Sequence, residues 1–203
     1  MGILPQLILN SIIAGAIYAL VALGFNLIYG ATKFFNLAHG IMAAIGGYTV
    51  FYFAKTLGLD VYVAIIFGVA LAGLVGFGLD KFIYLPLRRR KASSMVLFVA
   101  SLGAMTALQA VIAILFSSQF KTLSQTVGTQ KLFTILGGVI TQTQFVILLS
   151  TALVMAGLVA LLYKTQFGKA VRALSDDEGV ARIIGINTNN IIGYVFFIVS
   201  AIA

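Results

Sequence analysis

Residues 2–32, GILPQLILNSIIAGAIYALVALGFNLIYGAT, contain no charged side chain and decide the class of the fold. Three more uncharged runs follow, at residues 61–79, 92–120 and 132–163. A helix that crosses a bilayer needs about 20 mostly apolar residues to match the hydrocarbon layer. Each of these runs is close to that length or longer, whereas a soluble domain rarely contains even one. The sequence therefore predicts a polytopic membrane protein.

The composition supports a membrane domain and argues against several other classes. Hydrophobic residues make up 61% of the chain and charged residues 9%, against about 25% charged residues in ordinary soluble domains. The 203 residues suffice for one transmembrane domain, 1–203, and for no separate soluble domain. The net charge of +8 comes from basic residues beside apolar runs, a pattern typical of orientation signals and lipid contact rather than nucleic-acid binding. With no cysteine, one histidine and five carboxylates, we predict no catalytic, metal or cofactor site.

The apolar runs predict an all-α transmembrane bundle of five complete helices and a sixth near the end of the chain. The expected helices cover residues 4–29, 37–53, 61–85, 94–116 and 145–163, and the sixth starts near residue 191. Pro86 should end the third helix, because proline lacks the backbone N–H. The sixth run holds only about 13 residues, too few to cross, so we expect a C-terminally truncated chain. Residues 117–141 are expected to form a loop with a re-entrant or surface segment at 132–140.

Basic residues predict the orientation of the bundle. Ten lie in the loops at one expected end: Lys33, Lys81, Arg88, Arg89, Arg90, Lys91, Lys164, Lys169, Arg172 and Arg182. Three lie in the loops at the other: Lys55, Lys121 and Lys131. Because lysine and arginine are enriched in cytoplasmic loops, the first group predicts the cytoplasmic side and places the N-terminus outside.

Small residues recur every four positions on two of the expected helices. The first stripe comprises Ala64, Gly68, Ala72 and Gly76, and the second comprises Ala152, Ala156 and Ala160. Such stripes let helix backbones approach closely in a membrane, where no hydrophobic force drives helices together. We expect both to be packing seams.

Residues 26–47 combine polar side chains with glycines, and a broken helix is expected there. The candidate residues for a solute pathway are Asn26, Asn36, His39, Gly40 and Gly47. Buried polar side chains in a membrane face the protein interior or a water-filled cavity, and each glycine weakens a helix by about 1 kcal/mol relative to alanine. Two interpretations stay open: Asn36 caps the second helix while His39 hydrogen-bonds to a neighbouring helix, or these side chains contact a solute directly.

Residues 164–189 form the longest loop that we expect on the cytoplasmic side. Ser175 and Glu178 fit a capping box at the start of a short helix. Glu178 and Arg182 have the spacing of an i,i+4 ion pair, and Gly185 can end the helix in the left-handed conformation. The loop therefore predicts a short, well-capped helix outside the membrane.

This short helix also has an apolar face, formed by Val180, Ala181 and Ile184. Within the chain alone the face has little to pack against. We expect it to dock on a cytoplasmic partner, and the alternative is a solvated connector.

Motifs from both segments occur in a fixed order along the chain. They are N-L-A-H-G at 36–40, I-G-G-Y at 45–48, P-L-R at 86–88, G-K-A-V-R-A at 168–173, and then Asp177, Ala181 and G-I-N at 185–187. This series resembles the motifs of the LivH-type permease family, the membrane subunits of ABC importers for branched-chain amino acids. The likeness covers essentially the whole chain.

The resemblance implies a permease subunit that catalyses no reaction itself. The sequence lacks the phosphate-binding pattern G-x-x-x-x-G-K-[ST], so ATP would bind to separate cytoplasmic subunits. The coupling residues implied by the family are Gly168, Arg172, Ala173, Asp177, Ala181, Gly185, Ile186 and Asn187. The family also implies a second permease, a periplasmic or lipid-anchored substrate-binding protein, a bacterial inner membrane and alternating access.

Two other functions stay open. Relatives that import urea or short-chain amides share both motifs. A passive solute channel would also have half-helices around a pore, although a channel needs no docking site for an ATPase. An intramembrane enzyme is disfavoured, because no nucleophile–base pair can be recognised.

Overall fold

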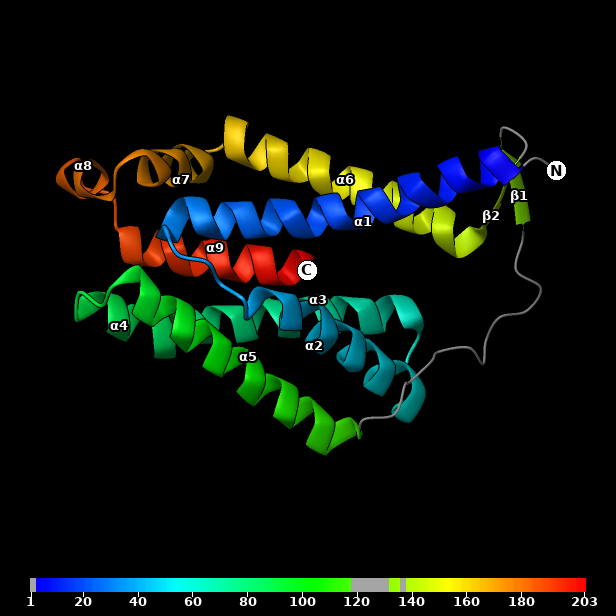
Figure 1. Cartoon of the computed structure of the whole chain (residues 1–203), viewed down its shortest axis with the longest axis horizontal. Helices are drawn as coiled ribbons and strands as arrows, with labels where there is room; N and C mark the ends of the chain where they lie inside the picture. Colours follow the sequence, from blue (N-terminus) through cyan, green and yellow to red (C-terminus); the bar gives the residue numbers. More distant parts are fainter. Residues whose placement is uncertain (1–2, 118–131, 136–137) are drawn as a thin grey trace.

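Long apolar helices run side by side in the computed structural model of the chain (Figure 1), which describes residues 3–117, 132–135 and 138–203. The long helices are α1 (Ile3–Thr32), α3 (Val61–Leu79), α5 (Ser94–Phe116) and α6 (Gln142–Lys164). Two shorter ones, α2 (His39–Phe51) and α9 (Thr188–Ile202), pack on α3. Among the residues described, four helices are long and apolar enough to span a bilayer. The prediction of a polytopic helical membrane protein is therefore confirmed.

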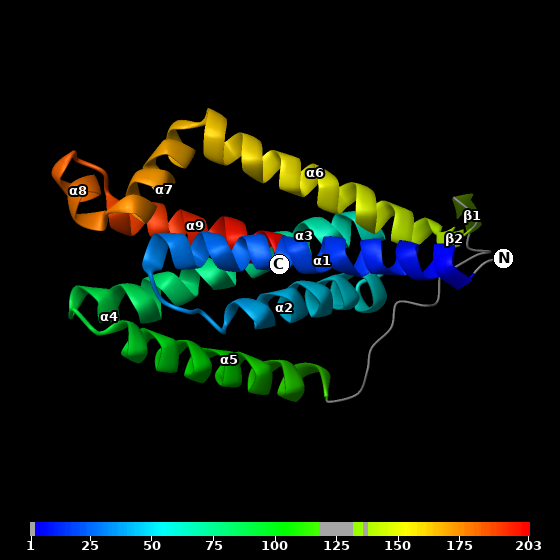
Figure 2. The same cartoon turned by 45° about the horizontal axis from the view of Figure 1, so that its top comes forward.

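The two ends of the bundle differ in structure. Figure 1 and Figure 2 show α4 (Leu85–Arg89), α7 (Gln166–Asp176) and α8 (Glu178–Ile183) at one end. We call this the basic end, because its helices carry basic residues such as Arg88 and Arg172. At the other end, a hairpin of β1 (Leu132–Ile135) and β2 (Gly138–Thr141) lies beside the start of α1.

The third expected helix does not stop before Pro86, so that prediction was wrong. After α3 the chain continues through a π-helical turn, η2 (Asp80–Tyr84), directly into α4. Pro86 falls within the first two positions of α4, where its missing N–H costs little. The other boundaries differ from expectation by a few residues, and α5 matches the expected 94–116. A second π-helical turn, η1 (Tyr52–Thr56), extends α2.

The segment expected to be re-entrant or to lie on the surface is a β-hairpin where the structure describes it. Its strands pair antiparallel, with Leu132 opposite Thr141. The Gln6 side chain of α1 accepts a hydrogen bond from the Val139 N–H at 2.8 Å and donates one to the Val139 carbonyl at 3.0 Å. These bonds hold the hairpin on α1. The rest of the expected loop, 118–131 with Lys121 and Lys131, lies outside the described residues.

The two small-residue stripes behave differently. All four members of the α3 stripe are buried. A Cβ added to Gly68 would lie 2.9 Å from the Gly46 carbonyl of α2, and one added to Gly76 would lie 2.9 Å from the Phe196 carbonyl of α9. The α3 seam is therefore confirmed.

On α6, by contrast, Ala152, Ala156 and Ala160 are exposed, and the buried residues are Thr151 and Leu158. The prediction of an α6 seam within the chain was wrong, because a stripe specifies close approach but not the partner.

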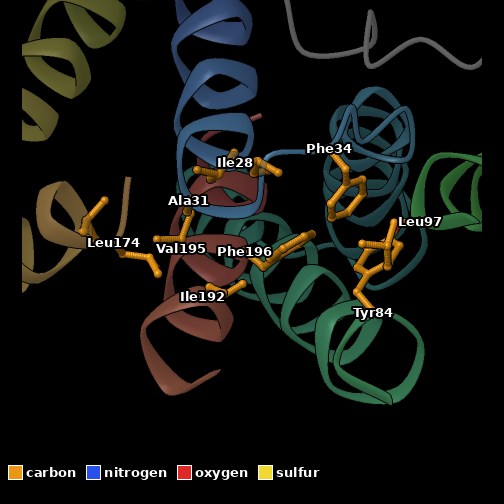
Figure 3. Close-up of a cluster of buried hydrophobic side chains, with 11 residues drawn as sticks. Ile28, Ala31, Phe34, Tyr84, Leu97, Leu174, Ile192, Val195 and Phe196 are labelled. Carbon is orange, nitrogen blue, oxygen red and sulfur yellow. The ribbon is translucent and has the colours of Figure 1, made fainter. Parts of the chain in front are cut away.

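The buried apolar cluster lies toward the basic end and joins segments that are distant in sequence (Figure 3). It contains Ile28, Ala31, Phe34, Tyr84, Leu97, Val171, Leu174, Ile192, Val195, Phe196 and Val199. Val171 and Leu174 come from α7, so this helix outside the spans is packed firmly against α1 and α9. The cluster therefore links the break between α1 and α2 to the 164–189 loop.

Candidate functional site

The expected break in residues 26–47 is a turn at Lys33–Ala38, which we call the hinge turn. It separates α1 from α2. Lys33 adopts a left-handed conformation with φ 56°, which ends α1 as glycine usually does at helix C-termini. The Lys33 ammonium donates to the Ser175 carbonyl at the end of α7. The hinge turn is thereby tied directly to the other candidate segment.

Asn36 lies buried at the centre of the hinge turn. Its Oδ1 accepts from the Ala38 N–H at 3.1 Å and from the Tyr84 hydroxyl at 3.0 Å. Asn36 thus makes a local turn bond just before α2, although Ala38 rather than Asn36 is the N-cap residue. The expectation that Asn36 caps α2 is corrected accordingly.

Two side chains from other helices hold the hinge turn, and sequence reasoning missed both. Ser101 Oγ of α5 accepts from the Leu37 N–H at 3.1 Å and donates to the Phe98 carbonyl at 2.7 Å. Tyr84 reaches Asn36 from η2. Neither residue lies near the motif in sequence, so a local pattern gave no signal for them.

His39 is the first residue of α2 and is 2% exposed. Among the described residues, neither ring nitrogen makes a hydrogen bond of standard geometry, but the Val21 backbone of α1 interacts with the ring. A hydrogen bond from His39 to a neighbouring helix, one of the two interpretations, would use this backbone. A Cβ added to Gly24 of α1 would lie 2.9 Å from His39 Nε2. Gly24, which sequence reasoning also missed, makes room for the imidazole.

The remaining pathway candidates do not join this buried group. Asn26 is exposed on α1 and contributes nothing to the buried group within this chain. Gly40 and Gly47 are exposed on α2, and a Cβ at either would meet nothing within 4 Å. Ala43 is also exposed. Since residues three and four apart share a helix face, these small residues leave one side of α2 open.

An apolar cavity of about 470 Å³ lies between α2, α3 and α5, toward the end opposite α4. Its lining includes Tyr48, Thr49, Tyr52, Ile112 and Phe116. The polar side-chain groups in the lining are hydroxyls, and Thr49 already donates to the Ile45 carbonyl. The cavity offers no charged group to a solute.

Two helices, rather than one, occupy the loop at 164–189. The first, α7, was missed, although its Thr165 cap and the apolar pair Val171 and Leu174 predict an amphipathic helix in retrospect. Thr165 accepts from the Gly168 N–H at 3.0 Å. A Cβ at Gly168 would lie 2.2 Å from the Leu162 carbonyl, so only glycine fits where α6 turns into α7.

The side chains of α7 divide between the core and the surface. Arg172 is exposed and lies over the Tyr163 ring, 5.0 Å from its centroid, while Ala173 is half-buried. One face thus packs on the bundle, and the other stays available.

The second helix, α8, begins two residues later than the expected capping box. Ser175 lies in the last turn of α7, and Asp177 is the N-cap, with its carboxylate accepting from the Val180 N–H at 3.0 Å. The Ser175–Glu178 box was therefore wrong, because packing of α7 extends that helix through Ser175. A capping box does occur at Thr141 and Gln144, at the start of α6.

The end of α8 agrees with expectation. Gly185 has φ +87°, and its N–H bonds to the Arg182 carbonyl at 3.1 Å, while the Ile186 N–H bonds to the Ala181 carbonyl at 3.0 Å. This pair of bonds is the Schellman motif, which requires a left-handed residue at that position. Asn187 then caps α9 by accepting from the Asn190 N–H at 3.3 Å.

The expected ion pair of α8 is also present. Arg182 Nη2 lies 2.6 Å from Glu178 Oε1. The Arg182 Nε donates to the Thr188 hydroxyl of α9 at 3.1 Å. Arg182 therefore connects α8 to the first residue of α9.

The apolar face of α8 is divided between the core and the surface. Ala181 is buried, whereas Val180 is 55%, Ile184 65% and Ile183 85% exposed. We call Val180, Ile183 and Ile184 the α8 tip. Figure 1 shows α8 projecting beyond the ends of the long helices. Sequence reasoning did not name Ile183, the most exposed member.

Comparison with known proteins identifies the family. The family described as "Branched-chain amino acid transport system / permease component" matches residues 7–203. The chain belongs to this permease family. Its members are non-catalytic membrane subunits of ABC transport systems.

Individual relatives give a consistent result. The chain is 29% identical to the high-affinity branched-chain amino acid transport system permease protein BraD of Pseudomonas aeruginosa, over 98% of this chain and 67% of BraD. It is 28% identical to the permease protein LivH of Escherichia coli, with the same coverage. A probable LivH of Methanocaldococcus jannaschii is 32% identical over 88% of this chain and 57% of its own length. No solved structure matches the chain significantly.

Proposed function

We propose that this permease moves branched-chain amino acids across a bacterial inner membrane, driven by ATP that separate subunits hydrolyse. Alternating access would expose the pathway to each side in turn. The observation that carries the proposal is the match of the permease family over residues 7–203. The relatives named above are described as branched-chain amino acid permeases, which supports this solute class.

The α8 tip is the proposed docking site for the ATPase subunit. Val180, Ile183 and Ile184 expose apolar side chains on a helix that is capped at both ends. Such a rigid, unpartnered apolar surface outside the membrane is typical of a docking site. Most coupling residues implied by the family have a structural role here. Those at the helix ends and in the packing between α7, α8 and α9 are Gly168, Asp177, Ala181, Gly185, Ile186 and Asn187. Arg172 and Ala173 lie on α7.

The open face of α2 is the proposed side of the solute pathway. Gly40, Ala43 and Gly47 lie on that face, and Asn36 and His39 lie at its start. A second, related permease would close the pathway from the other side. A substrate-binding protein would deliver the solute to the hairpin end, which the distribution of basic residues assigns to the exterior, together with the N-terminus.

The test is uptake by vesicles that contain the complex purified from its own host through a tag on this chain. ATP-dependent uptake of labelled leucine that unlabelled isoleucine and valine suppress is the expected result. ATP-dependent uptake of labelled urea without leucine uptake would show that the solute is urea, while the proposal of an ATP-driven importer would still hold. Leucine flux that persists without ATP and without the partner subunits would instead identify a passive channel.

A further inference from the structure

Tyr84 occupies a position between the hinge turn and the basic end. It is fully buried in η2, with ring centroids 5.2 Å from Phe34 and 5.3 Å from Phe196. Figure 3 shows Phe34 and Tyr84 side by side, with Phe196 reaching toward them. The Tyr84 hydroxyl donates to Asn36 Oδ1 at 3.0 Å. One side chain thus joins the helix that leads to α4 to the centre of the hinge turn.

The π-helical turn aims Tyr84 at Asn36. A π turn contains one more residue than an α turn, and one residue corresponds to about 100° of rotation around a helix. An α-helical η2 would therefore point Tyr84 away from the hinge turn.

An ion pair fastens the π turn to α4. Asp80 opens η2, and its carboxylate lies 2.6 Å from Arg88 Nη2, with the two side chains 3% and 12% exposed. Gly193 of α9 faces this site, because a Cβ there would lie 3.5 Å from the Asp80 carboxylate. Buried partners of this kind hold a defined geometry, since separating them leaves a buried charge.

Helix α9 connects this site to α8. The Arg182 Nε of α8 donates to the Thr188 hydroxyl of α9 at 3.1 Å, and further along α9 Gly193 faces Asp80 while Phe196 packs on Tyr84. Among the described residues, Arg88 Nε and Nη1 are buried without a hydrogen-bond partner, so unsatisfied donors make the present arrangement costly. A shift of α8 therefore reaches η2 through α9.

We propose that Tyr84 is a positioning residue for transport, through which movement of α8 reaches the hinge turn. The path runs from Arg182 of α8 to Thr188 of α9, from Gly193 and Phe196 of α9 to Asp80 and Tyr84 of η2, and from the Tyr84 hydroxyl to Asn36. This inference rests on the proposed function. Its consequence concerns His39, which follows the hinge turn directly and makes no hydrogen bond of standard geometry with the described residues. Displacement of the hinge turn therefore decides whether the His39 imidazole gains a hydrogen-bond partner.

The experiment uses the complete transporter in vesicles and a reporter on α2. The natural chain has no cysteine, so Ala43→Cys gives a single thiol on the open face. Its labelling rate is measured with and without a non-hydrolysable ATP analogue, in four backgrounds: otherwise natural, Tyr84→Phe, Tyr62→Phe and Lys33→Gln. Tyr62→Phe is the matched control, because it removes a hydroxyl from the same span at a side chain that is 74% exposed.

We expect the nucleotide to change the labelling rate in the natural and Tyr62→Phe backgrounds, and Tyr84→Phe to abolish most of that change. Leucine transported per ATP should fall about fivefold in Tyr84→Phe, in the range of coupling energies between distant sites. The rate of ATP hydrolysis and the melting temperature should stay close to those of the control. A structural defect alone would lower the leucine transported per ATP, the rate of ATP hydrolysis and the melting temperature together.

A double-mutant cycle guards against a folding defect. Asn36→Ala removes both the Tyr84 bond and the Ala38 bond. Adding Tyr84→Phe to Asn36→Ala should therefore lower the coupling no further, because the bond that Tyr84→Phe breaks is already absent. Additive losses would overturn the relay.

The relay would also be overturned if the nucleotide changed the labelling rate in Tyr84→Phe as much as in the natural background. If only Lys33→Gln lost this change, the path would run through the Lys33–Ser175 contact instead. If the natural background itself shows neither a nucleotide response nor ATP-driven uptake, the proposed function fails and the relay fails with it.

Discussion

The hinge turn and the α7–α8 loop are both breaks between apolar helices, but they are built in opposite ways. The hinge turn buries Phe34, Asn36 and Ala38 and is held from outside by Ser101 and Tyr84. The α7–α8 loop is largely exposed and held by its own caps at Thr165, Asp177 and Gly185. The first region therefore depends on distant helices for its shape, whereas the helix ends of the second are specified locally and only α7 packs on the bundle. This difference suits a hinge turn that must move with the bundle and an α7–α8 loop that must transmit force as a rigid unit.

The largest expected effect is that of Gly168→Ala, at the point where the α7–α8 loop leaves the membrane. The new Cβ would lie 2.2 Å from the Leu162 carbonyl and 2.4 Å from that of Leu161. Backbone cannot yield as a flexible side chain does, so we expect a destabilisation of about 3 kcal/mol. The measurement is the melting temperature of the purified complex.

Gly157→Ala on α6 is the control for this change, because its Cβ meets nothing within 4 Å. Equal melting temperatures for the two variants would mean that the loop is not fixed at Gly168.

Gly24→Ala tests the support of the hinge region and should cost somewhat less. Its Cβ would lie 2.9 Å from His39 Nε2 and 3.0 Å from Val199 Cγ1. Because side chains can shift, we expect a loss of about 2 kcal/mol in unfolding free energy, together with impaired uptake. Gly15→Ala on the same helix has open space around its Cβ and should behave as the natural protein. If both variants transport equally, His39 does not depend on α1.

His39→Leu separates function from stability in the hinge region. The imidazole makes no hydrogen bond of standard geometry with the described residues, so its removal should leave insertion and melting temperature unchanged or improved. Uptake should nevertheless fall about tenfold, if the imidazole stabilises another state of the cycle by about 1.4 kcal/mol. Thr106→Val, which removes an exposed polar group from α5, is the control. Full uptake by His39→Leu would reduce His39 to a packing residue.

Among the glycine substitutions, Gly185→Val should have the smallest effect on stability, and it acts on the α7–α8 loop alone. The residue has φ +87°, which a β-branched side chain resists at a cost of about 1–2 kcal/mol. The complex should still insert into the membrane. ATP hydrolysis should become uncoupled from uptake, because α8 loses the Schellman motif that ends it. Gly185→Asn tolerates the left-handed conformation better and should keep more coupling. Normal coupling in Gly185→Val would count against the docking role of α8.

The same contrast explains what the sequence could predict. The spans, the ion pair of Glu178 with Arg182 and the left-handed Gly185 follow from local patterns, and the structure confirms them. Tyr84 and Gly24 could not be found in this way, because their roles arise only when helices distant in sequence pack together.

The errors have similar physical causes. Pro86 was expected to end the third helix, yet a proline at the first positions of a following helix costs little. The Ser175 cap was displaced by tertiary packing of α7. Which solute passes, and through which residues, depends on partners that one chain does not encode.

The most direct test of the account is the side of the membrane on which α8 lies. Because the chain has no cysteine, Ile183→Cys and Leu57→Cys each give a single exposed thiol, at the basic end and at the opposite end. Spheroplasts are treated with a membrane-impermeant maleimide before and after permeabilisation. We predict that the Leu57→Cys variant is labelled in intact spheroplasts and the Ile183→Cys variant only after permeabilisation. Labelling of Ile183→Cys in intact spheroplasts would place the α8 tip away from ATP and contradict the account.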